Sequence, residues 1–181
     1  VHELWKSRRR EVLDSVQRIL TAVRGMDADE PGEEPGPADL DRAFKELRGR
    51  FDREHGGFGE APKFPSPHQL LFLLRYHDRS GEPEALDMVA ATLRALRQGG
   101  MYDHVGGGFH RYSTDRMWLV PHFEKMLYDQ ALLSMAYLEA YQATEDSAHA
   151  RTAEQIFTYV ARDLTAPEGG FYSAEDADSE G

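Results

Sequence analysis

Apolar residues recur every three to four positions along most of this chain, which predicts helices that each bury one face. Six such stretches are expected, at residues 3–24, 38–54, 67–79, 83–98, 121–143 and 147–164. The third contains the run "LLFLL" and is apolar nearly all round, which favours a buried helix. Pro83 and Pro121 suit the first position of a helix, where a missing N–H costs nothing. Sustained alternation and Asn-Gly or Asp-Gly turns are absent from the sequence, so the predicted class is all-α.

The sequence Gly-Gly-Phe recurs after the second, fourth and sixth predicted helices, beginning at residues 56, 107 and 169. A period of roughly 50–60 residues is typical of repeated helical hairpins, here about half of an (α/α)6 toroid. Alternate connections in a row of antiparallel helices lie at opposite ends, so the three loops should share one end. We call this end the Gly-Gly-Phe rim and expect it to be the functional face.

One partial toroid domain is expected over residues 1–181, with three hairpins and an acidic linker at 25–38 within the stretch "GMDADEPGEEPGPAD". The chain begins with Val1 rather than Met and ends within a loop, so we expect a piece of a longer protein.

Composition narrows the function classes. The net charge of −11 argues against binding to nucleic acid or to an anionic membrane. No apolar run approaches the roughly 20 residues of a membrane span, and no signal-peptide pattern opens the sequence. Cysteine is absent, which excludes disulfides and thiolate chemistry within these residues and fits a cytoplasmic location.

Histidines suggest acid–base chemistry on the rim. His104 and His110 flank three glycines, which allow close approach of a ligand. His122 and Glu124 follow Pro121 at the start of a predicted helix, where the dipole favours neutral imidazole, a form able to act as a base. These four residues are the candidate catalytic groups. The alternative is that the histidines cap loop carbonyls and that the helix dipole alone explains Glu124.

Aromatic and charged residues of the same loops could bind a sugar, with rings under the sugar face and polar groups at its hydroxyls. The candidates are Phe58, Lys63, Tyr102, Asp103, Phe109, Arg111, Tyr112, Asp115, Trp118, Glu175, Asp176 and Asp178. The alternative is ordinary packing of long loops against helix ends. Lys125 and Asp129 could form an i,i+4 pair on the predicted helix.

Metal and cofactor motifs are missing from the sequence. The histidines lack a compact ligand spacing such as H-E-x-x-H. The ending "DADSEG" resembles the first half of a calcium loop but stops before the glutamate at position 12. Phosphate-binding and nucleophile-elbow motifs do not occur, and the glycine clusters follow no predicted strand. We therefore expect neither metal nor cofactor.

Three long strings carry a family resemblance across residues 51–181: "GGFGEAPKFPSPHQLLFLLRYH", "GGMYDHVGGGFHRYSTDRMWLVPHFEKMLYDQALLSMAYLEAYQAT" and "GGFYSAEDADSEG". They resemble the YyaL-like family, which includes spermatogenesis-associated relatives. The resemblance implies a thioredoxin-like domain before Val1, followed by a six-hairpin toroid similar to that of N-acylglucosamine 2-epimerases. This chain would form the front half of that toroid. The proton-moving histidines of the epimerases lie in later hairpins, so none is carried over.

Two functions follow as expectations. The first is an epimerase-like domain that binds or isomerises a sugar-like small molecule by histidine acid–base chemistry. The second is a non-enzymatic binding module that works with the thioredoxin-like domain. Half a toroid would expose apolar flanks, so we expect the piece alone to self-associate and to be inactive without the remaining hairpins.

Overall fold

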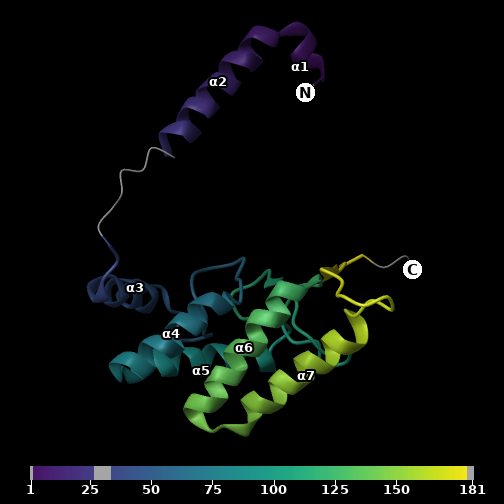
Figure 1. Cartoon of the computed structure of the whole chain (residues 1–181). Helices are drawn as coiled ribbons and strands as arrows, with labels where there is room; N and C mark the ends of the chain where they lie inside the picture. The colour runs from purple at the N-terminus through teal and green to yellow at the C-terminus, as the bar shows by residue number, and fades with distance from the viewer. Residues whose placement is uncertain (1, 27–33, 179–181) are drawn as a thin grey trace. The chain divides into compact units, whose positions relative to one another are not determined.

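A computed structural model describes residues 2–26 and 34–178 of the chain (Figure 1). Two compact units divide between Gly36 and Pro37. Half of the predicted acidic linker, residues 27–33, lies outside the described residues. The expectation of one domain over residues 1–181 stays a prediction.

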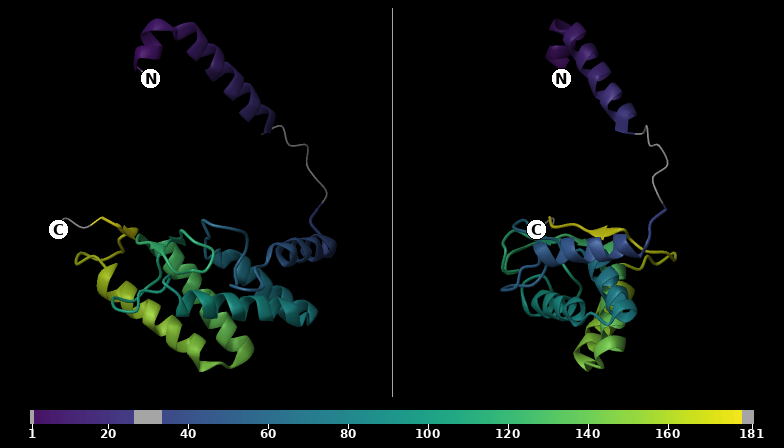
Figure 2. Two further views of the ribbon diagram at one scale, coloured as in Figure 1. Left: turned by 180° about the vertical axis from the view of Figure 1, so that it is seen from behind. Right: turned by 90° about the vertical axis from the view of Figure 1, so that its left-hand side faces the viewer.

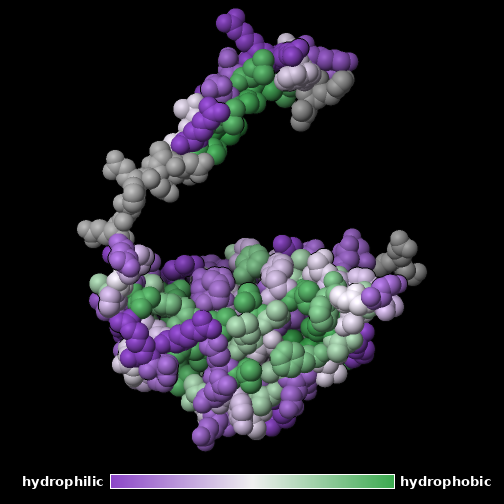
Figure 3. Space-filling model, in the orientation of Figure 1, coloured by the Kyte–Doolittle hydropathy of each residue, from purple (hydrophilic) through white to green (hydrophobic). Residues whose placement is uncertain are grey.

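The first unit contains helices α1 (His2–Ser7) and α2 (Arg9–Met26), where the sequence predicted one helix over residues 3–24. Apolar residues spaced three or four apart lie exposed along one side of α2, as the space-filling view shows (Figure 3). These residues are Leu13, Val16, Ile19, Leu20 and Val23.

The second unit is built from five helices. They are α3 (Pro37–Arg50), α4 (Pro67–Ser80), α5 (Pro83–Gln98), α6 (Leu127–Thr144) and α7 (Ser147–Asp163). Helix α6 packs against α4, α5 and α7 and is the central helix of the unit (Figure 1). Its Leu133, Ala136 and Tyr137 are buried, and the Tyr137 hydroxyl donates to the Leu93 carbonyl at 2.8 Å. Helix α4, predicted to be buried all round, buries one side only.

Two short turns close the hairpins. Gly81 at φ 73° ends α4, and the Glu82 carboxylate accepts a 3.2 Å hydrogen bond from the N–H of Glu84 at the start of α5. Asp146 similarly accepts a 2.9 Å bond from the N–H of Ala148 at the start of α7. These caps fix the helix ends. The bounds predicted for these three helices are therefore confirmed to within one residue.

Four two-residue strands form in the long loops. They are β1 (Tyr112–Ser113), β2 (Pro121–His122), β3 (Lys125–Met126) and β4 (Ala174–Glu175), and β1 pairs with β2 and β3 with β4, both antiparallel. The predicted start of a helix at Pro121 is wrong, since α6 begins at Leu127. His122 and Glu124 therefore do not lie at a helix N-terminus, and the dipole argument for a neutral His122 fails.

The long loops meet at one end of the second unit. Lys63 of the first loop forms a bridge with Ser113 of the second, and Lys125 of the second pairs with Glu175 of the third. The short turns after α4 and α6 lie at the other end, as two views show (Figures 1 and 2). The Gly-Gly-Phe rim predicted from the repeat is thus present, formed by loops 51–66, 99–126 and 164–178.

Candidate functional site

The three Gly-Gly-Phe loops share one backbone geometry. All six glycines have positive φ, with values for Gly56, Gly57, Gly107, Gly108, Gly169 and Gly170 of 71°, 77°, 82°, 77°, 92° and 81°. In the first loop Asp52 N–H donates to the Gly57 carbonyl at 2.9 Å, and Gly56 N–H donates to the Asp52 carbonyl at 2.8 Å. The second loop repeats both bonds from Asp103. Glycine is required here because other residues rarely adopt this conformation.

A buried lysine holds the first loop. Lys63 is fully buried, and its Nζ donates to Asp52 Oδ2 at 2.9 Å and lies 4.9 Å from the Trp118 ring centroid. Arg116 adds two bonds to the same carboxylate, at 2.7 and 2.9 Å. Burial would raise the pKa of Asp52, but the bonds from Arg116 and Lys63 outweigh it and hold that pKa well below its usual range.

The second loop repeats this arrangement. Lys125 Nζ donates to Asp103 Oδ2 at 2.8 Å and lies 4.7 Å from the Tyr159 ring centroid. Burial opposes ionisation of Asp103, yet its bond from Lys125 keeps the pKa far below the usual value. The predicted Lys125–Asp129 pair is wrong, because Lys125 lies in β3 rather than on a helix. The third loop has Ala166 in place of the aspartate, with its N–H donating to the Gly170 carbonyl at 3.1 Å.

Several predicted ligand-binding residues lie in the interior instead. Five are buried, namely Phe58, Lys63, Tyr102, Phe109 and Trp118. Asp115 accepts hydrogen bonds from the N–H groups of Met117 and Val120, at 2.7 and 2.6 Å, and so shapes its own loop. For these residues, the structure fits the alternative of ordinary loop packing against helix ends.

His104 has different contacts from those of His110 and His122. Its Nε2 is 3.1 Å from the Gly99 carbonyl, its Nδ1 is 3.4 Å from Arg97, and its ring meets Tyr102 edge-on. It lines an open groove of about 400 Å³ with residues of α5 and α7, among them Gln155.

Four of the predicted residues do gather, and we call them the Arg111 cluster: Arg111, Tyr112, His122 and Glu124. Arg111 Nη1 donates to Glu124 Oε2 at 2.7 Å, and the Arg111 N–H donates to the Glu124 carbonyl at 2.8 Å. The His122 ring stacks on Tyr112 with centroids 4.9 Å apart, and its Nδ1 lies 3.6 Å from Glu124 Oε2. Phe64 extends the stack, 5.0 Å from Tyr112.

His110 contacts Phe123, which lies between His122 and Glu124 of the Arg111 cluster. It is 6% exposed, and its Nδ1 lies 3.2 Å from the Phe123 carbonyl. Since a carbonyl only accepts, Nδ1 carries the proton and Nε2 is the acceptor. Burial lowers the pKa of His110, so the neutral form dominates near neutral pH.

Asp129 was missed as a site residue by the sequence reasoning. It lies in the first turn of α6, is 7% exposed, and lines a cleft of about 370 Å³ with Phe64, His68 and Tyr128. Burial raises the pKa of its carboxyl to about 6, although the positive charge of Arg111 opposes the shift. No sequence signal distinguishes it from an ordinary helix-capping acid.

Unsatisfied polar atoms concentrate at this place. Among the described residues, the buried side-chain atoms without a hydrogen-bond partner are Gln69 Oε1, Arg111 Nε, His122 Nδ1 and Asp129 Oδ2. Two of these four atoms belong to the Arg111 cluster, and a third belongs to Asp129. Such atoms are rare in native proteins and each calls for an explanation, of which an absent ligand is one.

Residues of the third loop contribute less. The Tyr159 hydroxyl donates to Glu175 Oε2 at 2.5 Å, and Lys125 Nζ lies 3.8 Å from the same carboxylate. Asp176 and Asp178 are exposed, and the Asp178 N–H donates to Asp176 Oδ1 at 3.3 Å.

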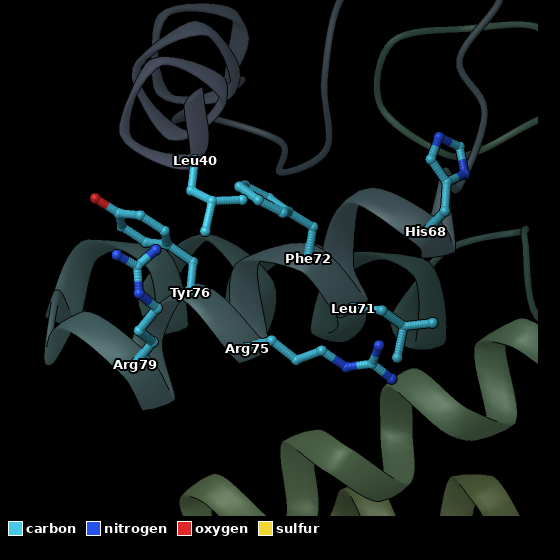
Figure 4. A pocket seen from close by; sticks show the side chains of 7 residues that line it. All are labelled: Leu40, His68, Leu71, Phe72, Arg75, Tyr76 and Arg79. Carbon is cyan, nitrogen blue, oxygen red and sulfur yellow. The ribbon is translucent and has the colours of Figure 1, made fainter. Parts of the chain in front are cut away.

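A larger groove of about 470 Å³ lies along α3 and α4 and contains none of the predicted site residues. Leu40 of α3 approaches Phe72 and Tyr76 of α4 there (Figure 4). The groove is mostly apolar, with Arg75 and Arg79 at one side.

No group of three His, Asp or Glu side chains within residues 2–26 and 34–178 is placed to hold a metal ion. None of the helices in these ranges is both long and apolar enough to span a bilayer.

Paired helices with their long loops on one rim define the class of the fold, about half of an α/α toroid. A sugar epimerase from a ruminal bacterium superposes with a TM-score of 0.68 at 19% identity, over 77% of this chain and 40% of that one. Cellobiose 2-epimerase from Bacillus thermoamylovorans gives 0.67 at 16% identity, with the same coverage. No family model matches the sequence.

In sequence, the chain is 46% identical to human spermatogenesis-associated protein 20 over 187 residues. That match covers 99% of this chain, which spans about a quarter of the human protein (24%).

Proposed function

We propose that this chain supplies part of the ligand-binding face of an epimerase-like toroid, and that the ligand is a sugar-like small molecule. The observation that carries the proposal is the Arg111 cluster, where buried Arg111 Nε and His122 Nδ1 lack partners beside the stacked ring of Tyr112. Aromatic faces and charged hydrogen-bonding groups suit a hydroxylated ring. The fold shared with sugar epimerases supports the same class of ligand.

The proposed chemistry is proton transfer by histidine. A neutral imidazole removes the proton from the carbon beside the carbonyl of an open-chain sugar, and return of a proton to the other face inverts that carbon. His122 is the first candidate base, with Glu124 3.6 Å from its Nδ1 to stabilise the imidazolium. His110, neutral through burial, is the second.

Calorimetry of the full-length protein with N-acetylhexosamines, combined with isomerisation assays, tests this proposal. We expect His122→Gln and Arg111→Gln each to weaken binding at least tenfold, since one good charged contact contributes about 1.5–3 kcal/mol. His104→Gln is the matched control, because His104 contacts Gly99 and Arg97 outside the cluster. Absence of binding and turnover by the unaltered protein across the panel would sink the proposal.

The second candidate function is a non-enzymatic binding module that acts beside a thioredoxin-like domain in the cytoplasm. The apolar groove with Leu40, Phe72 and Tyr76 favours it, since it could hold a peptide side chain (Figure 4). Partner capture that survives combined alanine substitution of His104, His110 and His122 would favour this candidate. Loss of capture in that variant would return the function to the rim.

A further inference from the structure

Asp129 is placed as a ligand-binding residue would be. Its carboxyl is more than nine-tenths buried, yet Oδ2 has no partner among the described residues, and the side chain lines a cleft. A buried polar atom without a partner destabilises the fold unless a further group completes its hydrogen bonding. Three other aspartates of the rim, Asp52, Asp103 and Asp115, each receive several hydrogen bonds. Asp129 is thus the exception that needs an outside partner.

The cleft beside Asp129 has the size and walls of a site for a single sugar ring. Its volume is about 370 Å³, within the usual range for small-molecule sites. Phe64 of the first loop and Tyr128 of α6 form two sides, and both rings are about half exposed. Leu132 and Ser66 complete the wall beside Asp129.

Charge around the cleft restricts the ligand. Arg111 is the cation whose field reaches Asp129, and Glu124 already holds it by a 2.7 Å ion pair. The Glu124 carboxylate offsets the charge of that guanidinium, so a phosphate or carboxylate entering the cleft would lie beside the Asp129 carboxyl without a compensating cation. Like charges repel strongly in a partly dry site, so anionic ligands are disfavoured.

We propose that Asp129 Oδ2 binds a hydroxyl group of an uncharged sugar ring seated between Phe64 and Tyr128, and that the Asp129 carboxyl rejects phosphorylated and carboxylated sugars. This rests on the proposed function for the sugar class and adds to it a binding residue and a charge preference. A carboxylate oxygen accepts a hydrogen bond, and a sugar hydroxyl donates one.

Titration calorimetry on the full-length protein tests the charge preference with matched probes, N-acetylglucosamine against N-acetylglucosamine 6-phosphate. We expect the neutral sugar to bind at least tenfold more tightly, and Asp129→Leu to reduce its affinity tenfold or more. Equal or tighter binding of the phosphate would overturn this inference while leaving the proposed function standing. Binding of neither probe would remove both.

Thermal unfolding without ligand gives an independent readout. Asp129→Asn should raise the melting temperature, because the substitution removes a buried acid that lacks a partner. Asp103→Asn is the control and should lower it, since Asp103 is bonded to Lys125 and to backbone N–H groups. A lower melting temperature for Asp129→Asn, with unchanged sugar affinity, would make Asp129 structural and overturn the inference.

Discussion

A single buried carboxyl, Asp129, makes a specific prediction for pH dependence. Its pKa of about 6 in the folded chain exceeds the ordinary value of 3.8. A carboxyl with a raised pKa contributes its full stability below about pH 4, and this stability is lost as the pH rises through 6. Asp129→Asn should therefore stabilise the chain by up to about 3 kcal/mol at pH 8 and change little at pH 4. Urea titrations at pH 4, 6 and 8 measure the difference.

The groups around Asp129 set the control for that experiment. Tyr128 and His68 line its cleft, and the positive charge of Arg111 lowers its pKa. The contribution of Asp103 to stability has the opposite pH dependence. Because its pKa is lowered in the fold, ionised Asp103 stabilises the chain above about pH 4, and this stability is lost as the pH falls further. Asp103→Asn should thus lower stability by a nearly constant amount from pH 4 to pH 8, whereas the gain from Asp129→Asn should grow over the same range. The same pH dependence in both variants would contradict the assignment.

At the residue scale, the sequence was informative where the candidate residues are close together along the chain. Arg111, Tyr112, His122 and Glu124 were singled out because unusual residue types crowd one loop, and the structure brings them together. Asp129 was missed because an i,i+4 pairing with Lys125 already explained it. That pairing presumed a helix from residue 121, and the error in the helix start hid the residue.

At the scale of one loop, alanine substitutions at two adjacent glycines distinguish the cost of backbone strain from the cost of a steric clash. Gly107 and Gly108 have nearly equal φ, 82° and 77°, so alanine at either meets about the same backbone cost of 1–2 kcal/mol. A Cβ on Gly108 would lie 2.6 Å from the Tyr159 ring, whereas one on Gly107 would meet only the Tyr159 Cβ, at 3.5 Å. Gly108→Ala should therefore cost about 1–3 kcal/mol more than Gly107→Ala in chemical denaturation. Equal costs would show that the ring moves aside freely.

The two buried lysines allow a comparison between repeats. Lys125→Met should destabilise the chain by about 3–5 kcal/mol, because it leaves Asp103 without the cation that bonds it. Lys63→Met should cost less, since Arg116 still holds Asp52 by two bonds. Denaturant unfolding measures both, and adding Asp103→Asn to Lys125→Met should restore part of the loss. Equal costs for the two lysines would argue against compensation by Arg116.

Helices with a clear end signal were the most predictable elements. Helices α4, α5 and α7 have Pro, Gly or Asp at their ends, and their predicted boundaries are correct to within one residue. The strands are two residues long, too short for an alternating pattern to show. Their existence depends on pairing between distant loops, and only the folded rim supplies it.

For the whole molecule, the repeat of Gly-Gly-Phe loops carried the correct class of fold. One loop geometry used three times places three loops on one end, and this follows from hairpin counting alone. The pairing of each loop with the next, Lys63 with Ser113 and Lys125 with Glu175, could not be foreseen because it depends on backbone segments of different hairpins meeting in the folded chain. The same dependence explains why the buried residues of the rim were first interpreted as ligand contacts.

Self-association is the prediction that belongs to the whole chain. Apolar side chains lie exposed on α2 and on α6, where Leu138 is an example, and exposed apolar surfaces of this kind drive association. Sedimentation velocity from about 1 to 100 μM should show a sedimentation coefficient that rises with concentration. Ile19→Glu on α2 and Leu138→Glu on α6 should each reduce the rise, and the larger effect identifies the dominant surface. Val105→Glu is the control, since Val105 is 99% exposed in a loop and its charge should change little. A concentration-independent monomer would show that these apolar faces do not associate, and it would contradict the prediction outright.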